Sequence, residues 1–273
     1  MKIVSFSGGL GNQLFEYLFY LDLSRRYGKV YGHYRKGRLS CHNGLEIQRW
    51  FDVRLPKATV GSDLLANCYK MLMKLRLLHE TSEDTYTDGR KGFFFEGYWQ
   101  GRQYYDERDI TTLRLLPLEL DGRNDELARE LNGKTNSVAL HVRRGDYLSN
   151  EHLRQVLGSV CNDEYYRMAL QQVFDKVERP TFYVFSDDIT WCRNHFSGYD
   201  NMVFVDWNRQ EDSFYDLYLM TLCRHHVIAN STFSYWGARL SKHADGITIY
   251  PERWLRGWDA PKIFPDEWTG IYV

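Results

Sequence analysis

The sequence has few prolines and no excess of charge of either sign. Only 6 of its 273 residues are proline, and 35 lysines and arginines face 36 aspartates and glutamates. A balanced surface gives no electrostatic reason to expect a nucleic-acid-binding protein. With 43% hydrophobic and 26% charged residues, the composition is that of a globular protein and excludes a disordered or fibrous one.

Cysteine is also scarce, and long apolar runs are absent. The five cysteines are scattered without a C-x-x-C pair, which indicates reduced thiols and excludes a disulfide scaffold. No window approaches the roughly 18 apolar residues of a transmembrane helix, and residues 1–7 lack the apolar stretch of a signal peptide. We therefore expect a cytoplasmic protein.

Residues 64–78 form the most amphipathic stretch of the sequence. Its apolar side chains are Leu65, Met71, Leu72, Leu75 and Leu78, and its basic ones are Lys70, Lys74 and Arg76. The pattern predicts a helix whose apolar side faces the core of the protein, and a helix lying on a membrane surface is the alternative.

Short β-branched and aromatic segments alternate with helical patterns along the chain. Strands are expected at 3–6, 137–142, 181–185, 202–205, 227–229 and 247–250, with helices between them. Such alternation predicts parallel sheets with crossover helices. Because a polar segment at 118–136 interrupts the pattern, we expect an N-terminal lobe at 1–130 and a C-terminal lobe at 131–273. The prediction is an α/β protein of two Rossmann-like lobes facing a cleft, with ligands at the carboxyl ends of the strands.

A glycine-rich turn at 7–13 (SGGLGNQ) follows the first expected strand. Glycines let the backbone approach a ligand, and the start of the next helix favours an anion or a hydroxyl oxygen. The turn is not a dinucleotide-binding fingerprint, because Leu14 stands where a third glycine is needed, and it is not a Walker loop. A plain tight turn is the alternative interpretation.

Two arginines, Arg143 and Arg144, follow the strand expected at 137–142. Crowding two guanidinium groups is unfavourable unless an anion lies between them, and their planar forks match phosphate oxygens. Asp146 comes three residues after Arg143 and can orient its guanidinium. A salt-bridged surface turn is the alternative.

Polar residues also follow two later strands. Asp187 and Asp188 come after the strand at 181–185, where acidic residues often hold ribose hydroxyls or base N–H groups. No Asp-x-Asp occurs in the chain, which disfavours a metal-bridged diphosphate, and a helix N-cap is the alternative role for Asp188. Ser231 and Thr232 open the helix after the strand at 227–229, as caps or as phosphate ligands. Together these turns predict a nucleotide-diphosphate cleft in which arginines and a helix N-terminus replace the metal.

Six segments of the chain, in order, resemble glycosyltransferase family 11, the α-1,2-fucosyltransferases. They are GGLGNQLFEY at 8–17, HNGLE at 42–46, EGYWQ at 96–100, HVRRGDY at 141–147, FSDD at 185–188 and ANSTFSYWGA at 229–238. The resemblance implies a GT-B-like fold and inverting transfer of fucose from GDP-β-L-fucose to the 2-hydroxyl of a galactose-containing oligosaccharide. It implies no metal ion and no cofactor. It further implies a bacterial enzyme of surface-glycan synthesis, cytoplasmic or peripheral on the inner membrane.

The resemblance also assigns roles to residues. It places Arg143 at the β-phosphate and, with Asp146 and Asn12, at the catalytic centre. The donor-binding residues would be His141, Arg144, Asp187, Ser231, Thr232, Phe233, Gly9 and Gly11. The acceptor-side residues would be Gln13, Glu16, Asn43 and Glu46. Glu16 departs from the family pattern, where many members carry glutamine, and adds a carboxylate close to the site.

The general base is left open among three carboxylates, Asp146, Glu16 and Glu46, with Asp146 favoured. Asp146 has the alternative role of orienting Arg143.

Two other classes of protein stay open. Protein O-fucosyltransferases and other GDP-sugar transferases share the arginine motif, although the HNGLE and ANSTFSYW segments favour the glycan enzyme. A non-catalytic sugar-binding protein would use the abundant aromatic residues, 16% of the chain, but rarely needs two arginines beside a helix N-terminus. The tryptophans of the C-terminal tail, Trp254, Trp258 and Trp268, are expected to shape the acceptor pocket.

Overall fold

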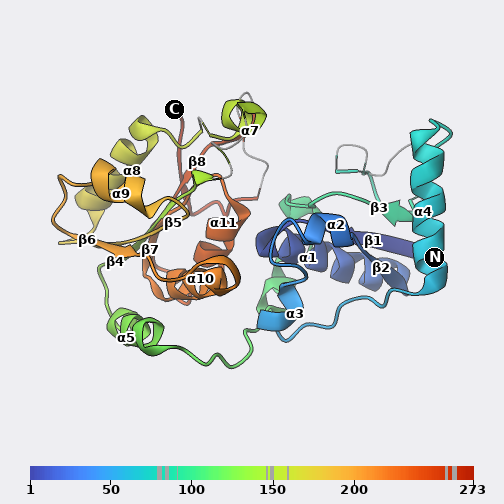
Figure 1. The fold of residues 1–273 in the computed structure, drawn as a ribbon, viewed down its shortest axis with the longest axis horizontal. Coiled ribbons are helices and arrows are strands. Elements are labelled where there is room, and N and C mark those ends of the chain that lie inside the picture. Colours follow the sequence, from blue (N-terminus) through green and yellow to red (C-terminus); the bar gives the residue numbers. More distant parts are fainter. Residues whose placement is uncertain are drawn as a thin grey trace. The chain divides into compact units, whose positions relative to one another are not determined.

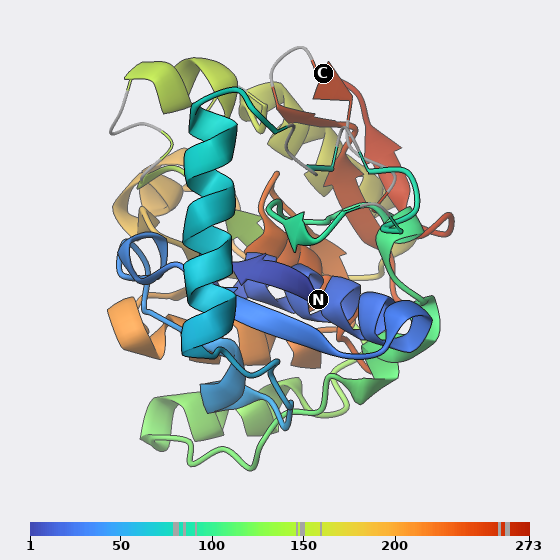
Figure 2. The ribbon, with the colours of Figure 1, turned by 90° about the vertical axis from the view of Figure 1, so that its right-hand side faces the viewer.

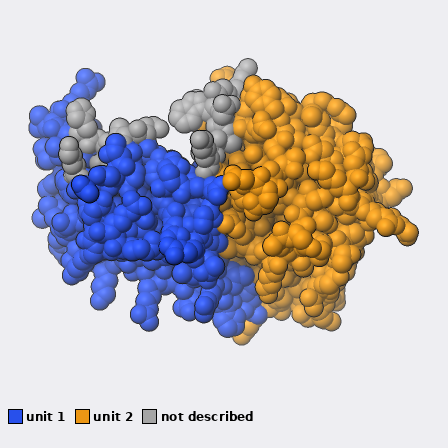
Figure 3. All heavy atoms as spheres, turned by 180° about the vertical axis from the view of Figure 1, so that it is seen from behind, with its two compact units in different colours: residues 1–118 blue, residues 119–273 orange. Residues whose placement is uncertain are grey.

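The structure, a computed structural model, consists of two compact units, Met1–Leu118 and Glu119–Val273 (Figure 3). It describes residues 1–78, 82–83, 86–90, 92–145, 147, 151–158, 160–255, 258–259 and 263–273. The sequence predicts the boundary at 130/131, whereas the units divide at 118/119. The difference arises because helix α5 (Gly122–Leu131) packs on helix α10 (Ser213–Leu222) and so belongs to the second unit.

In the part of the chain that the structure describes, unit 1 holds a three-stranded parallel sheet in the order β2–β1–β3 (Figure 1). The strands are β1 (Lys2–Phe6), β2 (Val30–Tyr34) and β3 (Phe94–Phe95). The helices are α1 (Leu10–Tyr27), α2 (Lys36–Leu39), α3 (Ile47–Trp50) and α4 (Val60–Lys74), with 3₁₀ turns at Arg102–Tyr104 and Glu107–Thr112. Since the strands are parallel, the segments that follow β1, β2 and β3 leave the same edge of the sheet.

Helix α1 connects β1 to β2 and buries most of its apolar side chains. Phe19 stacks on Trp99 with 3.9 Å between ring centroids, which holds α1 against the segment that follows β3. The helix ends at Gly28, whose φ of 77° is a conformation that glycine adopts without the Cβ clash of other residues.

Unit 2 holds, among its described residues, a six-stranded parallel sheet in the order β11–β8–β7–β4–β5–β6. The strands are β4 (Ser137–Val142), β5 (Thr181–Ser186), β6 (Met202–Val205), β7 (His225–Val227), β8 (Thr248–Pro251) and β11 (Thr269–Ile271). The short strands β9 (Arg253–Leu255) and β10 (Trp258–Asp259) pair separately. The remaining helices are α7 (Glu151–Val156), α8 (Asp163–Lys176), α9 (Ile189–His195), the 3₁₀ turn Gln210–Asp212 and α11 (Thr232–Arg239).

The central strand β4 has all six residues buried, as is typical of a parallel sheet covered on both faces. Its apolar side chains share a core with Leu170 and Val173 of α8. The predicted α/β class with parallel sheets is confirmed. The strands expected at 137–142 and 202–205 match β4 and β6, whereas the one expected at 227–229 lies two residues earlier, as β7.

The orientation expected for helix α4 is wrong. The sequence predicts that its leucines and methionine face the core, but Leu65, Met71, Leu75 and Leu78 are exposed. The side that packs against the sheet carries Ala66 and Tyr69, with Ser62 buried in the first turn. Periodicity identified the helix correctly but assigned its apolar side to the wrong environment.

In the described ranges no helix combines the length and the hydropathy needed to cross a bilayer.

The five cysteines are free thiols, as predicted.

Candidate active site

In unit 2, the turns after β4 and β5 meet, and carboxylates from one hold arginines from the other. Arg143 Nε lies 3.2 Å from Asp187 Oδ2, and the backbone N–H of Arg144 donates to Asp187 Oδ1 at 2.9 Å. Gly145 permits this approach, since a Cβ at that position would lie 2.9 Å from Asp187 Oδ2. Two residues assigned to the donor from the sequence, Arg143 and Asp187, are therefore brought together.

Arg144 is held from two further directions. Its Nε lies 3.4 Å from Asp188 Oδ2, and its guanidinium lies over the indole ring of Trp191 at 3.9 Å from the ring centroid. Asp188 Oδ1 in turn accepts from the backbone N–H of Trp191 at 3.1 Å and so caps helix α9. Asp188 thus takes the role of helix cap that was the alternative for it, and a contact from Asp187 or Asp188 to a ribose or a base stays a prediction.

His141 is buried beneath these arginines. Burial, and then the nearby charge of Arg143, lower the pKa of His141 to about 3, so its imidazole is neutral at physiological pH. Its ring lies against Phe233, with 5.9 Å between centroids. Among the described residues, no group pairs with the buried Nδ1 of His141. A neutral imidazole with an unpaired nitrogen can donate to or accept from a ligand.

The turn between β7 and α11 is fixed through Asn230. Its side-chain NH₂ donates to the backbone carbonyls of Leu157 and Trp254 at 3.2 and 3.1 Å. The backbone carbonyl of Asn230 accepts from the Tyr147 hydroxyl at 3.0 Å. Ser231 is the N-cap residue of α11, yet its side chain makes no capping hydrogen bond. The first N–H groups of α11, at Thr232 and Phe233, therefore lack a side-chain cap from Ser231.

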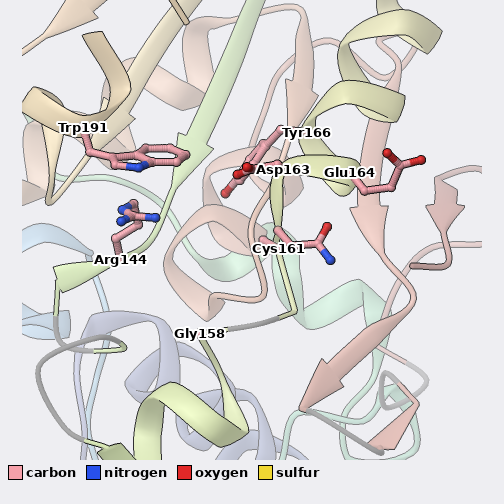
Figure 4. Close-up of a pocket in the computed structure, with 8 residues that line it drawn as sticks. Arg144, Gly158, Cys161, Asp163, Glu164, Tyr166 and Trp191 are labelled. Atoms are coloured by element: carbon pink, nitrogen blue, oxygen red, sulfur yellow. The ribbon is translucent and has the colours of Figure 1, made fainter. Parts of the chain in front are cut away.

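A pocket of about 430 Å³ lies beside Arg144 in unit 2 (Figure 4). The residues lining it are Arg144, Gly158, Cys161, Asn162, Asp163, Glu164, Tyr166 and Trp191. Burial raises the pKa of the Cys161 thiol to about 12, so the thiol stays neutral. The pocket thus combines the Arg144 cation with two carboxylates from the first turn of α8 and the rings of Tyr166 and Trp191.

Asp146, which the sequence places at the catalytic centre, lies outside the described residues.

In unit 1, the glycine-rich turn and the HNGLE segment are joined by Gln13. The side-chain carbonyl of Gln13 accepts from the backbone N–H groups of Glu46 and Ile47 at 2.9 and 3.1 Å. Its side-chain NH₂ donates to the carbonyls of Gly8 and Gly44, both at 2.9 Å. Gln13 is fully buried, and these bonds satisfy its amide completely.

Glu16 and Glu46, the two glutamates assigned to the acceptor side, are buried as well. Glu16 accepts from the backbone N–H and the hydroxyl of Ser7, and burial raises its pKa well above the usual value. Glu46 accepts from the Leu10 N–H at 3.2 Å and from the Asn43 amide at 3.2 Å, and burial raises its pKa too. Their predicted acceptor-side roles stay predictions.

Asn12 joins two of the unit 1 motifs. Its side-chain oxygen accepts from the Gln100 amide at 3.1 Å, which joins the glycine-rich turn to the EGYWQ segment. Gly8 has φ +75°, and a Cβ there would lie 2.7 Å from the Asn12 amide nitrogen. Gly9 precedes α1, and a Cβ on it would approach His42 at 3.5 Å, while Gly11 is buried in the first turn.

Sequence reasoning missed a polar cluster beside the end of β2. His33 Nδ1 lies 3.0 Å from Asp63, and its Nε2 lies 3.0 Å from Lys70 Nζ. Burial, followed by the charges of Arg35 and Arg38, lowers the pKa of Lys70 to about 8. The three residues come from β2 and α4, and no short motif in the sequence marks them.

Trp191 was missed for a related reason. It stands alone in a helical pattern, and only the fold brings Arg144 onto its ring.

Solved structures share this fold. The α-1,6-fucosyltransferase NodZ soaked with GDP-fucose aligns with a TM-score of 0.53 at 13% identity, over 87% of this chain and 91% of NodZ. NodZ from Bradyrhizobium aligns at 0.52 and 12% identity, over 86% and 90%. The two units, each with a parallel sheet, therefore have the GT-B fold.

Comparison of the sequence with protein-family models identifies the family. A model of the family described as glycosyl transferase family 11 matches residues 4–272. The chain therefore belongs to glycosyltransferase family 11.

Its relatives differ in what they transfer. The Escherichia coli α-1,2-colitosyltransferase is 30% identical over 98% of both chains. The Escherichia coli O-antigen biosynthesis glycosyltransferase WbnK is 28% identical over 97% of this chain and 98% of its own. Galactoside α-(1,2)-fucosyltransferase 1 of Saimiri boliviensis boliviensis is 34% identical over 49% of this chain and 38% of its own.

Proposed function

We propose that this glycosyltransferase transfers L-fucose from GDP-β-L-fucose to the 2-hydroxyl of a galactoside, with inversion, during synthesis of a surface glycan. The observation that carries the donor assignment is the arginine pair at the end of β4, held by Asp187 and Asp188 from the end of β5. Relatives that form α-1,2 linkages support the linkage.

Arg143 and Arg144 would neutralise the charge that grows on the diphosphate as GDP leaves. Asp187 fixes the Nε edge of Arg143 and Asp188 that of Arg144, so both guanidinium groups are oriented before the donor binds. Preorganised donors of this kind stabilise a transition state by roughly 3–4 kcal/mol each. The N–H groups at the start of α11 would add a partial positive charge.

His141 would serve the donor as a neutral hydrogen-bonding group. With a pKa of about 3 it carries no charge near pH 7, so it adds nothing to the electrostatic stabilisation. Its unpaired Nδ1 suits a polar atom of the nucleotide.

The reaction as proposed needs no metal, because two guanidinium groups and a helix N-terminus supply the positive charge. The acceptor hydroxyl must lose a proton to a base or to solvent. Asp146 remains our assignment for that base, with Glu16 and Glu46 as the other candidates. Both glutamates have raised pKa values and buried oxygens that already accept hydrogen bonds, which favours a structural role for them.

The test is to incubate the purified protein with GDP-fucose, GDP-mannose or UDP-galactose and a panel of galactosides, with EDTA present. Product mass and linkage by NMR, together with nucleotide release, identify donor and bond. Transfer from GDP-fucose alone, undiminished by EDTA and giving an α-1,2 linkage, is expected. Turnover with GDP-mannose or UDP-galactose, or a need for added metal, would contradict the proposal. GDP binding without turnover for any acceptor would identify a sugar-binding protein instead.

A second donor has a specific observation in its favour. The colitosyltransferase is similar over nearly the whole of both chains, and colitose is L-fucose without its 3-hydroxyl. GDP-colitose therefore belongs in the same donor panel. A site that hydrogen-bonds the 3-hydroxyl would discriminate strongly against the deoxy sugar, so comparable rates with both donors would indicate that no such bond is made.

A further inference from the structure

Helix α4 is apolar on two opposite sides. One side packs Ala66 and Tyr69 against Ile3 of β1 and Phe94 of β3. On the other, Val60, Leu64, Met71 and Leu75 are 88%, 63%, 57% and 60% exposed. Figure 2 shows α4, in cyan, with the blue strands of unit 1 beside its lower half.

The exposed residues form one continuous line. At about 100° of rotation per residue, Val60, Leu64, Cys68, Met71 and Leu75 fall within about 40° of a common direction, opposite Ala66 and Tyr69. We call these five residues the α4 stripe. A helix that is apolar on both sides is normally covered on both, so the stripe requires an occupant.

The exposed charges around the stripe are mostly positive. Lys57, Lys74 and Arg76 are exposed, and none of them has an ion-pair partner among the described residues. The one acidic residue of 57–78, Asp63, has 47% of its side chain exposed but is hydrogen-bonded to His33. Because the whole chain has a net charge of −1, this basic character is local to α4.

The end of the helix places a cation at an unusual position. Arg76 has φ 59°, its N–H donates to Met73 O at 2.8 Å, and Leu77 N donates to Leu72 O at 2.9 Å. This is the hydrogen-bond pattern of a Schellman motif, in which glycine usually holds the left-handed position. An arginine there is conformationally unfavourable, so its presence favours a role for the charge.

We propose that the α4 stripe binds an anionic lipid surface, with α4 lying in the plane of the interface. The stripe would enter the boundary between headgroups and acyl chains, while Lys57, Lys74 and Arg76 contact lipid phosphates. An apolar face flanked by basic residues is what such helices require. This inference goes beyond the proposed function and does not rest on it.

A second copy of the chain fits the stripe less well. A two-fold contact between copies would bring Lys57, Lys74 and Arg76 of one against the same residues of the other, in parallel or antiparallel alignment. Asp63 is the one acidic residue of 57–78 and already bonds His33, so positive charges would predominate on both sides of such a contact.

The first experiment measures flotation of the full-length protein with vesicles. One set is phosphatidylcholine, and the other is phosphatidylcholine and phosphatidylglycerol in equal parts. We expect binding to the anionic vesicles that weakens as salt is added. Leu64→Gln with Met71→Gln should reduce the affinity by about tenfold or more. Unchanged binding by this double variant would overturn the proposal.

Charge variants test the lipid phosphates. Lys74→Glu should weaken binding to anionic vesicles by more than about fivefold, since one cation near such a surface contributes about that factor. Lys176→Glu, at an exposed position on α8, is the matched control and should bind as the wild type does. Equal losses in the two variants would overturn the assignment to α4.

The variant Arg76→Gly distinguishes an effect on vesicle binding from an effect on the stability of the fold. Glycine suits the left-handed position, so this variant should unfold at the same temperature or higher while its vesicle affinity falls by about fivefold. An unchanged affinity would remove Arg76 from the surface.

The chain's own cysteines report where the lipid lies. Cys68 belongs to the stripe, whereas Cys41 is exposed elsewhere in unit 1. A nitrobenzoxadiazole label on Cys68, with Cys41→Ser, should brighten and shift to the blue on anionic vesicles, and a label on Cys41, with Cys68→Ser, should not. Equal responses at both sites would show nonspecific adsorption. A dimer seen by sedimentation, lost in the Leu64→Gln/Met71→Gln variant and without vesicle binding, would show that the stripe is a contact between copies.

Discussion

The motifs of the two units differ in how deeply their polar side chains are buried and in how many hydrogen bonds these make within the protein. In unit 1, Gln13 and Glu16 are fully buried, and the Gln13 amide makes four hydrogen bonds to backbone groups. In unit 2, Arg143 and Asp187 keep 32% and 24% of their side chains exposed. The unit 1 motifs therefore act first as a scaffold, whereas those of unit 2 keep charged side chains partly exposed, as our proposed donor site requires.

The sharpest test of this comparison is Arg143→Ala. If unit 2 supplies the charge that stabilises the leaving diphosphate, kcat/KM falls by about 10²–10³ while the fold is unaffected. Arg129→Ala, on the exposed surface of α5, removes a guanidinium that pairs with Asp125 and should leave kcat/KM unchanged. Steady-state kinetics measure kcat/KM, and a thermal melt checks that each variant is folded. A near-native rate in the folded Arg143 variant would remove it from the site.

The converse test is Gln13→Ala. This change leaves the N–H groups of Glu46 and Ile47 without their acceptor, so the free energy of unfolding should fall by about 2–4 kcal/mol. Urea denaturation measures the loss. Gln171→Ala, on the exposed side of α8, is the control and should change the free energy of unfolding by less than about 0.5 kcal/mol. A fully stable Gln13→Ala protein would break the distinction between scaffold and ligand site.

The buried carboxyl of Glu16 predicts a pH dependence of stability. Because its folded pKa is raised above the unfolded one, the bound proton stabilises the folded protein. That contribution is complete below the unfolded pKa and is lost as the pH rises through the folded pKa. Between about pH 5 and pH 8 the wild type should lose stability relative to Glu16→Gln, by up to about 1.4 kcal/mol per pH unit.

Urea unfolding of the wild type and Glu16→Gln across that range measures the difference. Glu178→Gln, at an exposed position, is the control, and its difference in stability from the wild type should not vary with pH over this range. A constant difference between the wild type and Glu16→Gln would mean that Glu16 ionises normally and is available as a base.

The smallest expected effect concerns Trp191. Its ring under the Arg144 guanidinium should stabilise the orientation of that arginine by about 0.5–2 kcal/mol, so Trp191→Leu should raise the KM for the GDP-sugar by about 3–30-fold with little change in kcat. Trp191→Phe should restore part of the loss. Trp207→Leu, which removes a more distant ring from Arg123 at 5.4 Å, is the control. Equal KM values in Trp191→Leu and Trp207→Leu would make Trp191 a packing residue only.

The sequence was a good guide where local pattern decides structure. The positions of strand β4 and of the arginines after it were predicted correctly, because a short apolar run followed by charged residues is typical of a buried parallel strand. Strand β7 was displaced because His225 and His226 look polar, yet both are buried, and burial lowers the pKa of His226 to about 4.

Contacts between residues far apart in the sequence could not be predicted from local sequence patterns. The bonds from Gln13 to residues 46 and 47 depend on how the chain returns to the sheet, and nothing near Gln13 encodes them. For α4, both sides of the helix are apolar, so periodicity could not choose which one packs on the sheet.

The boundary at 118/119 has a consequence for how such proteins diversify. Each unit is one uninterrupted stretch of chain, and the polypeptide passes from the first to the second once. A single recombination at this joint would therefore exchange one complete sheet with all its turns and leave the other intact. Within such a lineage, the arginine-bearing half and the half with the glycine-rich turn can be inherited from different parents, so their specificities are free to evolve separately.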